Sequence, residues 1–308
     1  SAGQWIDLAK QVFDAGTLGL LLTGGEPMVR KDFCEIYRGI YETGFLITLY
    51  TNATLVTPEI MALLRQYPPH RIGVTLYGAS NETYAAVCGC ADGFDRAMAG
   101  IAQLKTLPSV LDFRMTLIRD SASDAEKIIE LVKQRFGANV TQTGTVFQSV
   151  RGGCAQASQC RLTPEENMEM TIGRLVEKIK AKIPAELKDG LQLRLQDVKE
   201  ECAPEQFRYS LLGCSAGMDS YTISWDGKLL GCQMLGNFYT DTISQGFARA
   251  WEQFPYTVHL PRENPQCAAC ELHSLCPVCP AVRMAECKDL SGVPQYICSM
   301  TKLLQEKK

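Results

Sequence analysis

The sequence predicts an α/β fold, in which helices alternate with the strands of a parallel sheet, followed by a small cysteine-rich domain of hairpins and turns. From residue 1 to about 147, segments with helical spacing of apolar residues alternate with short apolar segments, which is the pattern of repeated βαβ units. From residue 214 onward turns and cysteines dominate, and eight of the 14 cysteines fall within residues 214–298. This pattern does not decide between a barrel and an open sheet.

The N-terminal half supplies the predicted strands and helices in alternation. The predicted strands are 18–22, 45–50, 72–77, 113–118 and 140–147, of which 18–22 is predicted to be buried. The predicted helices cover 6–13, 31–41, the segment that starts at Thr57, 94–104 and the segment that starts at Ser123. Thr57-Pro58-Glu59 has the residue types of a helix N-terminus, and Ser123-Asp124-Ala125-Glu126 predicts a capping box.

The C-terminal half divides into a bridging region and a cysteine-rich region. Residues 149–163 are predicted as a loop, and a long helix capped by Thr163 and Pro164 is predicted to run to Ile183. Asp226-Gly227, between two short apolar segments, predicts a β-hairpin. The helical period disappears after Cys214, and the segment has too little apolar material for a core of its own. We therefore predict three parts: 1–150, 151–213 and 214–308.

Composition and charge limit the classes of partner. The 308 residues carry 31 basic and 34 acidic side chains, a net charge of −3, which gives no electrostatic case for nucleic acid or an anionic membrane. No apolar run approaches the roughly 18–20 residues of a membrane span, and the first residues do not resemble a signal peptide. We expect a cytoplasmic protein, in which cysteines bind metal more readily than they form disulfides.

Seven cysteines between residues 214 and 298 have spacings typical of metal ligands. Cys-x2-Cys occurs twice, at Cys267/Cys270 and at Cys276/Cys279, and thiolates two residues apart on a turn reach one metal centre together. These four cysteines are enough for one zinc site, which stays open as an alternative. The further cysteines, Cys214, Cys232 and Cys298, indicate more than one centre.

The order of these cysteines resembles the SPASM domain of radical S-adenosylmethionine (SAM) enzymes, which carries two auxiliary 4Fe–4S clusters. Cys276 and Cys279 are separated by two residues where the family pattern has three. The resemblance implies an outer cluster held by Cys267, Cys270, Cys276 and Cys298, and an inner cluster held by Cys214, Cys232 and Cys279. Cys202 is one candidate for the fourth inner ligand. The remaining cysteines fall outside the pattern: Cys34, Cys88, Cys90, Cys154, Cys160 and Cys287.

A second motif lies where the first predicted strand ends. Gly24-Gly25-Glu26-Pro27 occupies a strand C-terminus, the edge at which α/β barrels hold ligands, and the two glycines allow close approach to the backbone. This segment resembles the radical SAM motif that holds the SAM amino group. At later strand ends, Thr51-Asn52, Thr75 and Arg114 resemble further cofactor-binding positions; Ala53 stands where the family has glycine. Strand-end capping is the alternative role for these polar residues.

This sequence differs from the radical SAM pattern in one motif. That family holds its SAM-cleaving cluster with Cys-x3-Cys-x2-Cys, a spacing found nowhere in this sequence, and only 23 residues precede Gly24. We therefore expect a partial barrel lacking its first strand, a chain that starts downstream of the motif, and no SAM cleavage by the chain as given. A homologue that has lost the catalytic cluster is the alternative.

The resemblance implies an enzyme that uses a SAM-derived radical to abstract hydrogen from a peptide or protein substrate. Formation of thioether or related crosslinks in a ribosomal peptide is the leading hypothesis, with a flavodoxin or ferredoxin as electron donor. A sulfatase-maturing enzyme is an alternative, although Gln233 replaces the aspartate that those enzymes carry after the second cysteine. A non-catalytic electron-transfer or peptide-binding protein is the third hypothesis.

Overall fold

The computed structural model describes residues 1–148, 157–173, 214–257, 260 and 264–306, which fall into two compact units. The first unit comprises residues 1–143 and 242–248, and the second comprises 144–241 and 249–308. The predicted boundaries at residues 150 and 213 adjoin segments outside the described residues and stay a prediction.

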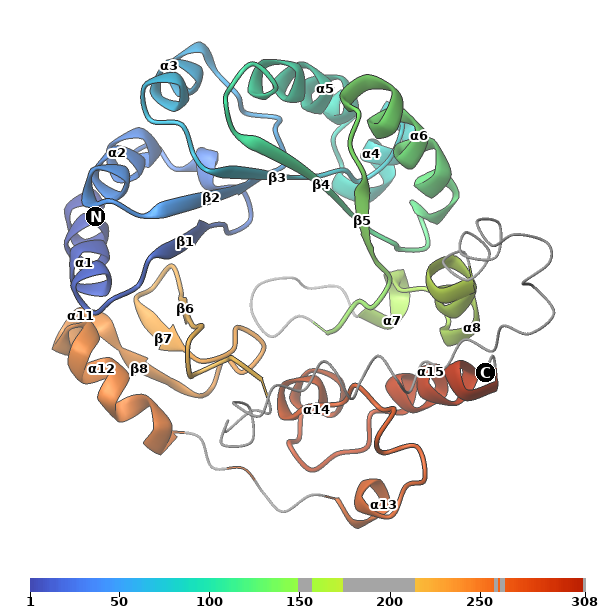
Figure 1. Cartoon of the computed structure of the whole chain (residues 1–308). Helices are drawn as coiled ribbons and strands as arrows, with labels where there is room; N and C mark the ends of the chain where they lie inside the picture. The colour runs from blue at the N-terminus through green and yellow to red at the C-terminus, as the bar shows by residue number, and fades with distance from the viewer. Residues whose placement is uncertain (149–156, 174–213, 258–259, 261–263, 307–308) are drawn as a thin grey trace, which may run out of the picture. The chain divides into compact units, whose positions relative to one another are not determined.

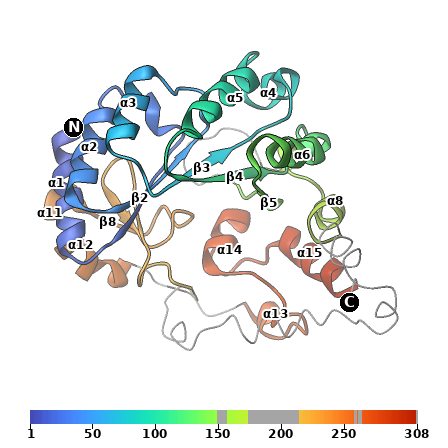
Figure 2. The same ribbon diagram turned by 45° about the horizontal axis from the view of Figure 1, so that its top comes forward.

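The first unit is built on a parallel sheet of five strands in sequential order (Figures 1 and 2). The strands are β1 (Gly19–Leu22), β2 (Leu46–Thr51), β3 (Arg71–Thr75), β4 (Val110–Thr116) and β5 (Val140–Thr143). Each new strand is added at the same edge, so right-handed crossovers place the connecting helices on one face. A doubly wound sheet would reverse direction. The sequential order is therefore that of a partial barrel, as expected from the resemblance.

Six α-helices connect these strands or precede them. They are α1 (Ala2–Asp14), α2 (Phe33–Thr43), α3 (Pro58–Gln66), α4 (Asn81–Cys88), α5 (Gly93–Leu104) and α6 (Ala125–Phe136). The Thr57 hydroxyl accepts a hydrogen bond from the Ile60 N–H at 3.3 Å, which confirms the predicted N-cap. Helix α4 was not predicted, because only Tyr84 among its residues is buried. The short helix α11 (Thr242–Gln245) also belongs to this unit.

Two sequence predictions in this unit are wrong. Strand β1 is not buried, since Leu18 is 69% and Leu21 is 46% exposed. Among the described strands it pairs with β2 alone, at the edge of the sheet. The capping box at Ser123–Glu126 does not form either, because α6 begins at Ala125 and its N-cap, Asp124, makes no capping bond. The Asp124 side chain instead reaches the loop after β3.

The register gives the sheet two chemically different faces, because paired residues point to the same side. One face carries apolar rows, such as Leu22, Leu49, Ile72 and Leu111, of which Leu49 and Ile72 are fully buried. The connecting helices lie on one side of the sheet (Figure 2). On the opposite face the rows become polar toward the carboxyl ends of the strands. The successive polar rows are Tyr50, Gly73 and Asp112; then Thr75, Arg114 and Thr141; then Thr116 and Thr143.

Gly100 in α5 offers a test of the packing around the end of β2. A methyl group added at Gly100 would lie 1.9 Å from the carbonyl oxygen of Ala53, a backbone atom with no freedom to move away. We expect Gly100→Ala to lower the free energy of unfolding by more than about 2 kcal/mol. Urea denaturation measures this change. Gly3→Ala in α1 is the control, because it meets no atom within 4 Å and is expected to gain about 0.5–1 kcal/mol.

The second unit contains the cysteine-rich region. The predicted hairpin is confirmed: β6 (Thr222–Ile223) pairs antiparallel with β7 (Lys228–Leu230), and Gly227 takes a φ of +77° in the turn. A third strand, β8 (Tyr239–Asp241), completes the sheet. The other described helices of this region are α7 (Ala157–Cys160), α8 (Pro164–Met168), α12 (Phe247–Gln253), which begins in the first unit, α13 (Pro265–Ala268), α14 (Pro280–Cys287) and α15 (Gln295–Glu306).

The helices of this unit correct two further expectations. The loss of helical period after Cys214 was wrongly taken to exclude helices, because α14 and α15 follow there and bury Ala285, Tyr296 and Ile297. The long helix predicted from Thr163 starts with Thr163 as its N-cap, as predicted, and Thr163 and Glu166 also bond reciprocally in a capping box. After α8 it continues as a π-helix, Glu169–Gly173, and its predicted remainder lies outside the described residues.

A buried polar network joins distant segments of the second unit. Arg161 Nη1 lies 2.7 Å from Glu286 Oε1 in α14, and its guanidinium carbon is 3.8 Å from the centre of the Tyr296 ring. The Tyr296 hydroxyl donates to the Leu162 carbonyl and accepts from the Asn167 amide. The network thereby fixes α14 and α15 against α8 and the segment before it.

Within the described parts of the chain, no helix has the length and apolar character needed to cross a bilayer.

Candidate cofactor sites

Glu26 joins the loop after β1 to the loop after β2. Its Oε2 accepts hydrogen bonds from the Thr51 hydroxyl at 2.9 Å and from the Asn52 N–H at 2.7 Å, while Oε1 accepts from the Met28 N–H at 3.1 Å. A carboxylate can accept about four hydrogen bonds, so Glu26 keeps capacity for another donor. The first two segments of the predicted site, Gly24–Pro27 and Thr51-Asn52, therefore lie together.

The backbone at Gly24 and Gly25 has room for a ligand, whereas the backbone at Ala53 has none. Side chains added at Gly24 or Gly25 would meet no atom within 4 Å. Ala53, in contrast, is fully buried and adopts a φ of +60°, a left-handed conformation that favours glycine. The position where alanine replaces the family's glycine thus keeps the conformation that glycine suits.

Thr75 and Arg114 are direct neighbours on the polar face, as the pairing of β3 with β4 shows. The Arg114 guanidinium lies over the Tyr50 ring, 4.5 Å from its centre, and Gly73 leaves space for that ring. Among the described residues, the buried Nε of Arg114 has no hydrogen-bond partner. A buried donor of this kind favours a ligand with an acceptor group, because an unsatisfied buried donor costs about 1–3 kcal/mol.

Asp124 holds the loop that follows β3, a role not anticipated from the sequence. Its carboxylate accepts from the Ala79 N–H at 3.0 Å, from the Thr83 hydroxyl, and from Lys127 Nζ at 2.9 Å. Asp124 is only 4% exposed. Burial opposes ionisation, but these hydrogen bonds outweigh it and hold the pKa of the carboxyl below its usual value. Only the three-dimensional contact reveals this role, since Ala79 and Asp124 are 45 residues apart.

Asp124→Asn is expected to destabilise the protein by about 2–3 kcal/mol at pH 7, the cost of losing charge-assisted hydrogen bonds in a buried place. Because the folded-state pKa is lowered, the stabilisation is fully present above about pH 4 and is lost as the pH falls through the folded-state pKa. Unfolding measured at pH 7 and pH 3 should therefore show a smaller difference between wild type and variant at pH 3. The exposed Asp120 in the same loop supplies the control, Asp120→Asn, with no change at either pH.

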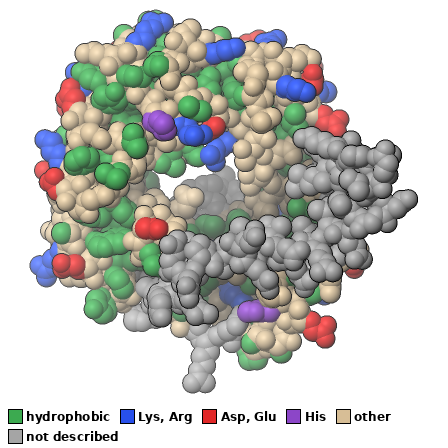
Figure 3. Space-filling model, viewed as in Figure 1, with side chains coloured by type: hydrophobic (Ala, Val, Ile, Leu, Met, Phe, Trp, Pro, Cys, Tyr) green, Lys and Arg blue, Asp and Glu red, His purple; other side chains and the backbone are tan. Residues whose placement is uncertain are grey.

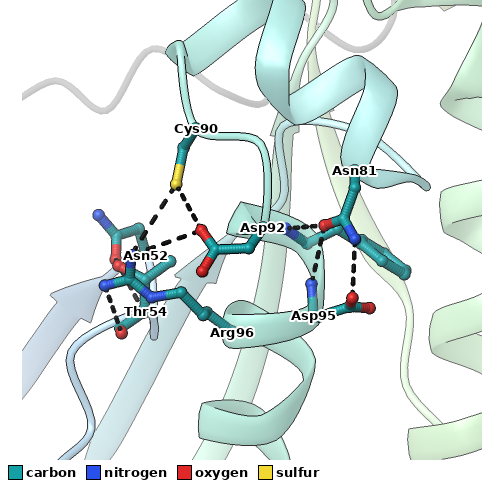
Figure 4. A network of polar contacts seen from close by, with 8 residues as sticks. Asn52, Thr54, Asn81, Cys90, Asp92, Asp95 and Arg96 are labelled. Carbon is teal, nitrogen blue, oxygen red and sulfur yellow. Dashed lines mark hydrogen bonds and ion pairs between the residues drawn. The ribbon is translucent and has the colours of Figure 1, made fainter.

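The loop after β2 is also tied to the segment between α4 and α5 (Figure 4). The Asn52 side-chain oxygen accepts from both the N–H and the hydroxyl of Thr54. Arg96 donates to the Thr54 carbonyl at 3.3 Å, and its other nitrogen lies 3.7 Å from Asp92. The Asn52 amide oxygen is thereby engaged in shaping its own loop, which supports strand-end capping as part of its role.

The seven cysteines with ligand spacing form two groups in the second unit. Burial raises the pKa of the Cys232 thiol, and the nearby Cys279 and Cys214 raise it further. Burial likewise raises the pKa of the Cys298 thiol, with added contributions from Cys276, Cys267 and Cys270. Cys276 and Cys279 pack against the same apolar cluster of Val282, Tyr296 and Ile297. The ligand sets that the resemblance implies for the inner and outer clusters stay a prediction.

The charged side chains give no sign of a polyanion site. On the face shown in Figure 3, the acidic and basic side chains of the described residues are scattered and do not gather in a patch of one sign. The net charge of the chain is −3.

Comparison with known proteins finds a family similarity within the first unit. Residues 1–132 match the family model described as "Radical SAM superfamily". The N-terminal part of this chain is therefore similar to radical SAM domains. The AdoMet-dependent heme synthase of Methanosarcina barkeri is 28% identical over 280 residues, covering 88% of this chain and 79% of that protein. The PqqA peptide cyclase of Ruegeria pomeroyi is 27% identical over 179 residues, covering 58% of this chain and 47% of the cyclase.

Solved structures agree on the fold. Streptococcus suis SuiB bound to its precursor peptide SuiA superposes with a TM-score of 0.67 at 16% identity, covering 96% of this chain and 69% of SuiB. At this identity the likeness shows the fold alone. The expected α/β architecture with a parallel radical SAM partial barrel is thereby confirmed.

The residues at the carboxyl edge of the sheet fit SAM as a ligand. SAM carries an ammonium, a carboxylate and ribose hydroxyls. The open backbone at Gly24-Gly25, the spare acceptor capacity of Glu26 and the buried Nε of Arg114 offer the complementary groups along one edge of the sheet. Tyr77, whose pKa is raised by burial and further by Cys88 and Glu26, lies near the same edge.

Zinc and a 4Fe–4S cluster make different demands on the cysteine sulfurs. Within the described residues, no three His, Cys, Asp or Glu side chains converge closely enough to hold one ion. Zinc requires four ligands at about 2.0–2.3 Å from one centre, whereas the four cysteines of a 4Fe–4S cluster each bind a different iron. The zinc site therefore stays open as an alternative to the two clusters.

Proposed function

We propose that the chain belongs to an enzyme that binds SAM at the carboxyl edge of the sheet and carries two auxiliary 4Fe–4S clusters in the cysteine-rich region. The observation that carries this proposal is the junction made by Glu26, which brings the Gly24–Pro27 loop to the end of β2. Bound SAM supplies a 5′-deoxyadenosyl radical when a reduced cluster cleaves it. None of the 14 cysteines has the Cys-x3-Cys-x2-Cys spacing, so we propose that these 308 residues bind SAM without cleaving it.

We further propose a peptide substrate. The polar face beside Arg114 presents the hydroxyls of Thr75, Thr116, Thr141 and Thr143. Hydroxyls suit a peptide, whose backbone offers donors and acceptors along its length. The likeness to a peptide cyclase and to SuiB, a protein solved with a peptide, supports the same substrate class. The modification we favour is a crosslink such as a thioether in a ribosomal peptide, with a flavodoxin or ferredoxin supplying electrons.

A heme-forming activity is the second candidate, because the AdoMet-dependent heme synthase matches 88% of the chain. A macrocycle of that kind needs a broad apolar wall. The carboxyl half of the open face carries threonines and Arg114 instead, which favours the peptide. Leu46 and Val110, which are 61% and 48% exposed, are the first residues of β2 and β4.

Two further alternatives follow from the cysteine region. A sulfatase-maturing activity needs a base after the second cysteine, and Gln233 cannot accept a proton there. A non-catalytic electron-transfer or peptide-binding role would keep the auxiliary clusters and dispense with SAM. Binding of SAM at the Glu26 edge separates this last role from the enzyme.

Ligand binding to the anaerobically reconstituted chain tests the proposal. Equilibrium dialysis measures SAM, fluorescence anisotropy measures a labelled pool of cysteine-containing peptides, and visible absorbance follows a porphyrin. We expect SAM and the peptide pool to bind, and SAM to be recovered uncleaved after addition of dithionite. Porphyrin binding without peptide binding would replace the peptide by the heme-related activity. Absence of SAM binding would refute the cofactor site.

A further inference from the structure

Arg283 places a buried positive charge beside a cysteine of the outer group. It lies on α14 with only 6% of its surface exposed. Its Nη1 donates to Cys267 Sγ at 3.3 Å and to the Gly292 carbonyl at 2.8 Å. A guanidinium does not lose its proton in proteins, so this charge is permanent. Cys267 is itself 9% exposed, which leaves little water to screen the pair.

Helix α14 connects this contact to the inner group. Cys279 is the N-cap of the helix, and its carbonyl accepts the Arg283 N–H at 3.0 Å. The helix that starts at an inner cysteine therefore positions a cation against an outer one. The arrangement is held from the other end of the helix by Glu286, which pairs with Arg161. Arg283 has a defined position between the two cysteine groups.

The inner group has a different environment. Burial raises the pKa of Cys232, and hydrogen bonds from the backbone N–H groups of Met234 and Leu235 act in the opposite direction. Neutral donors of this kind interact with a sulfur about half as strongly as a charged donor does. Hydrogen bonds to the sulfurs and nearby charge are among the factors that set the potential of an iron–sulfur cluster.

We propose that Arg283 is a positioning residue that acts through Cys267 to raise the reduction potential of the outer cluster. The inference rests on the proposed function, since it requires a cluster on the outer cysteines. Reduction adds one electron to the cluster, with no bond made or broken and no proton taken up. The cluster becomes more negative by one charge, and the fixed guanidinium stabilises that reduced state more than the oxidised one.

The test is a redox titration of the reconstituted chain with dithionite as reductant, followed by electron paramagnetic resonance. Wild type should show two cluster midpoints. Arg283→Gln and Arg283→Met should move one of the two midpoints to a more negative potential. The expected shift is about 59 mV for one electron, which corresponds to a tenfold change in the reduced-to-oxidised ratio at fixed potential. Arg283→Lys should retain most of the wild-type value. The exposed Lys302, near Cys298, gives the control Lys302→Gln with little change.

The outcomes separate this inference from the proposed function. Full iron content with both midpoints unchanged in the two neutral variants would overturn the role of Arg283 and leave the clusters standing. A chain that takes up no 4Fe–4S cluster would overturn both. If neither neutral variant holds the outer cluster while Arg283→Lys does, Arg283 is a structural support of the site, and the tuning role is wrong.

Discussion

Replacing Cys298 with alanine is expected to remove one whole cluster, about four of about eight irons per chain, because a 4Fe–4S cluster depends on all of its protein ligands. The resemblance assigns Cys298 to the outer cluster with Cys267, Cys270 and Cys276, and Cys232 to the inner one. Cys232→Ala is expected to remove the other four irons. Anaerobic reconstitution followed by iron and sulfide analysis measures both losses.

Cys287→Ala is the matched control for the cysteine variants. Cys287 lies near enough to Cys267 for the two thiols to interact, yet it falls outside the ligand spacing. We expect its variant to keep full iron. A single metal lost from every variant, or stoichiometric zinc in the wild type, would restore the four-cysteine zinc site as the correct assignment.

Glu26→Gln is expected to weaken SAM binding by about a hundredfold, equivalent to about 2.7 kcal/mol. The variant keeps the length of the side chain and replaces one acceptor oxygen by a donor. Glu26 accepts from Thr51, Asn52 and Met28, so at least one of these bonds is lost, and bonds to a charged group contribute about 1.5–3 kcal/mol each. The loss of the charge that would face the SAM ammonium adds to this effect.

Equilibrium dialysis with SAM measures the effect of Glu26→Gln. The control is Glu35→Gln, which removes the same charge from an exposed position in the first turn of α2. A Glu26 variant that binds SAM as tightly as wild type would show that Glu26 serves only to cap β2. Urea unfolding of both variants separates lost affinity from lost stability.

The parallel sheet could be predicted because its information is local. Apolar segments such as 45–50 and 72–77 are spaced by helical segments, and Gly-Gly and Pro residues mark where strands end. The sequence could not show that β1 is exposed, since exposure depends on what covers the outer edge of the sheet. The sequence also did not predict α15. Its apolar residues Tyr296 and Ile297 lie directly before Cys298, and the spacing of the cysteines dominated the interpretation of that segment.

In the candidate site, too, the local motifs could be predicted and the long-range contacts could not. Gly24–Pro27 and Thr51-Asn52 could be found from their place at strand ends, while the bonds between them required the register of β1 against β2. The sequence pattern placed Asp124 in a predicted capping box at Ser123–Glu126, because a capping box is a local pattern of four residues. Its carboxylate instead satisfies donors more than 40 residues away, and no local pattern encodes such a contact.

The carboxylate of Glu26 has a consequence for the entropy of binding. Because one side chain is bonded to both Thr51 and Asn52, the loop after β1 is already ordered before any ligand arrives. Ordering a residue costs about 1–2 kcal/mol of backbone entropy. Here the loop is ordered when the chain folds, so this cost does not reduce the affinity for a ligand. A ligand at this edge would therefore be selected by the fit of its groups to a fixed frame, and close analogues that fit poorly would gain little from adjustment of the loop.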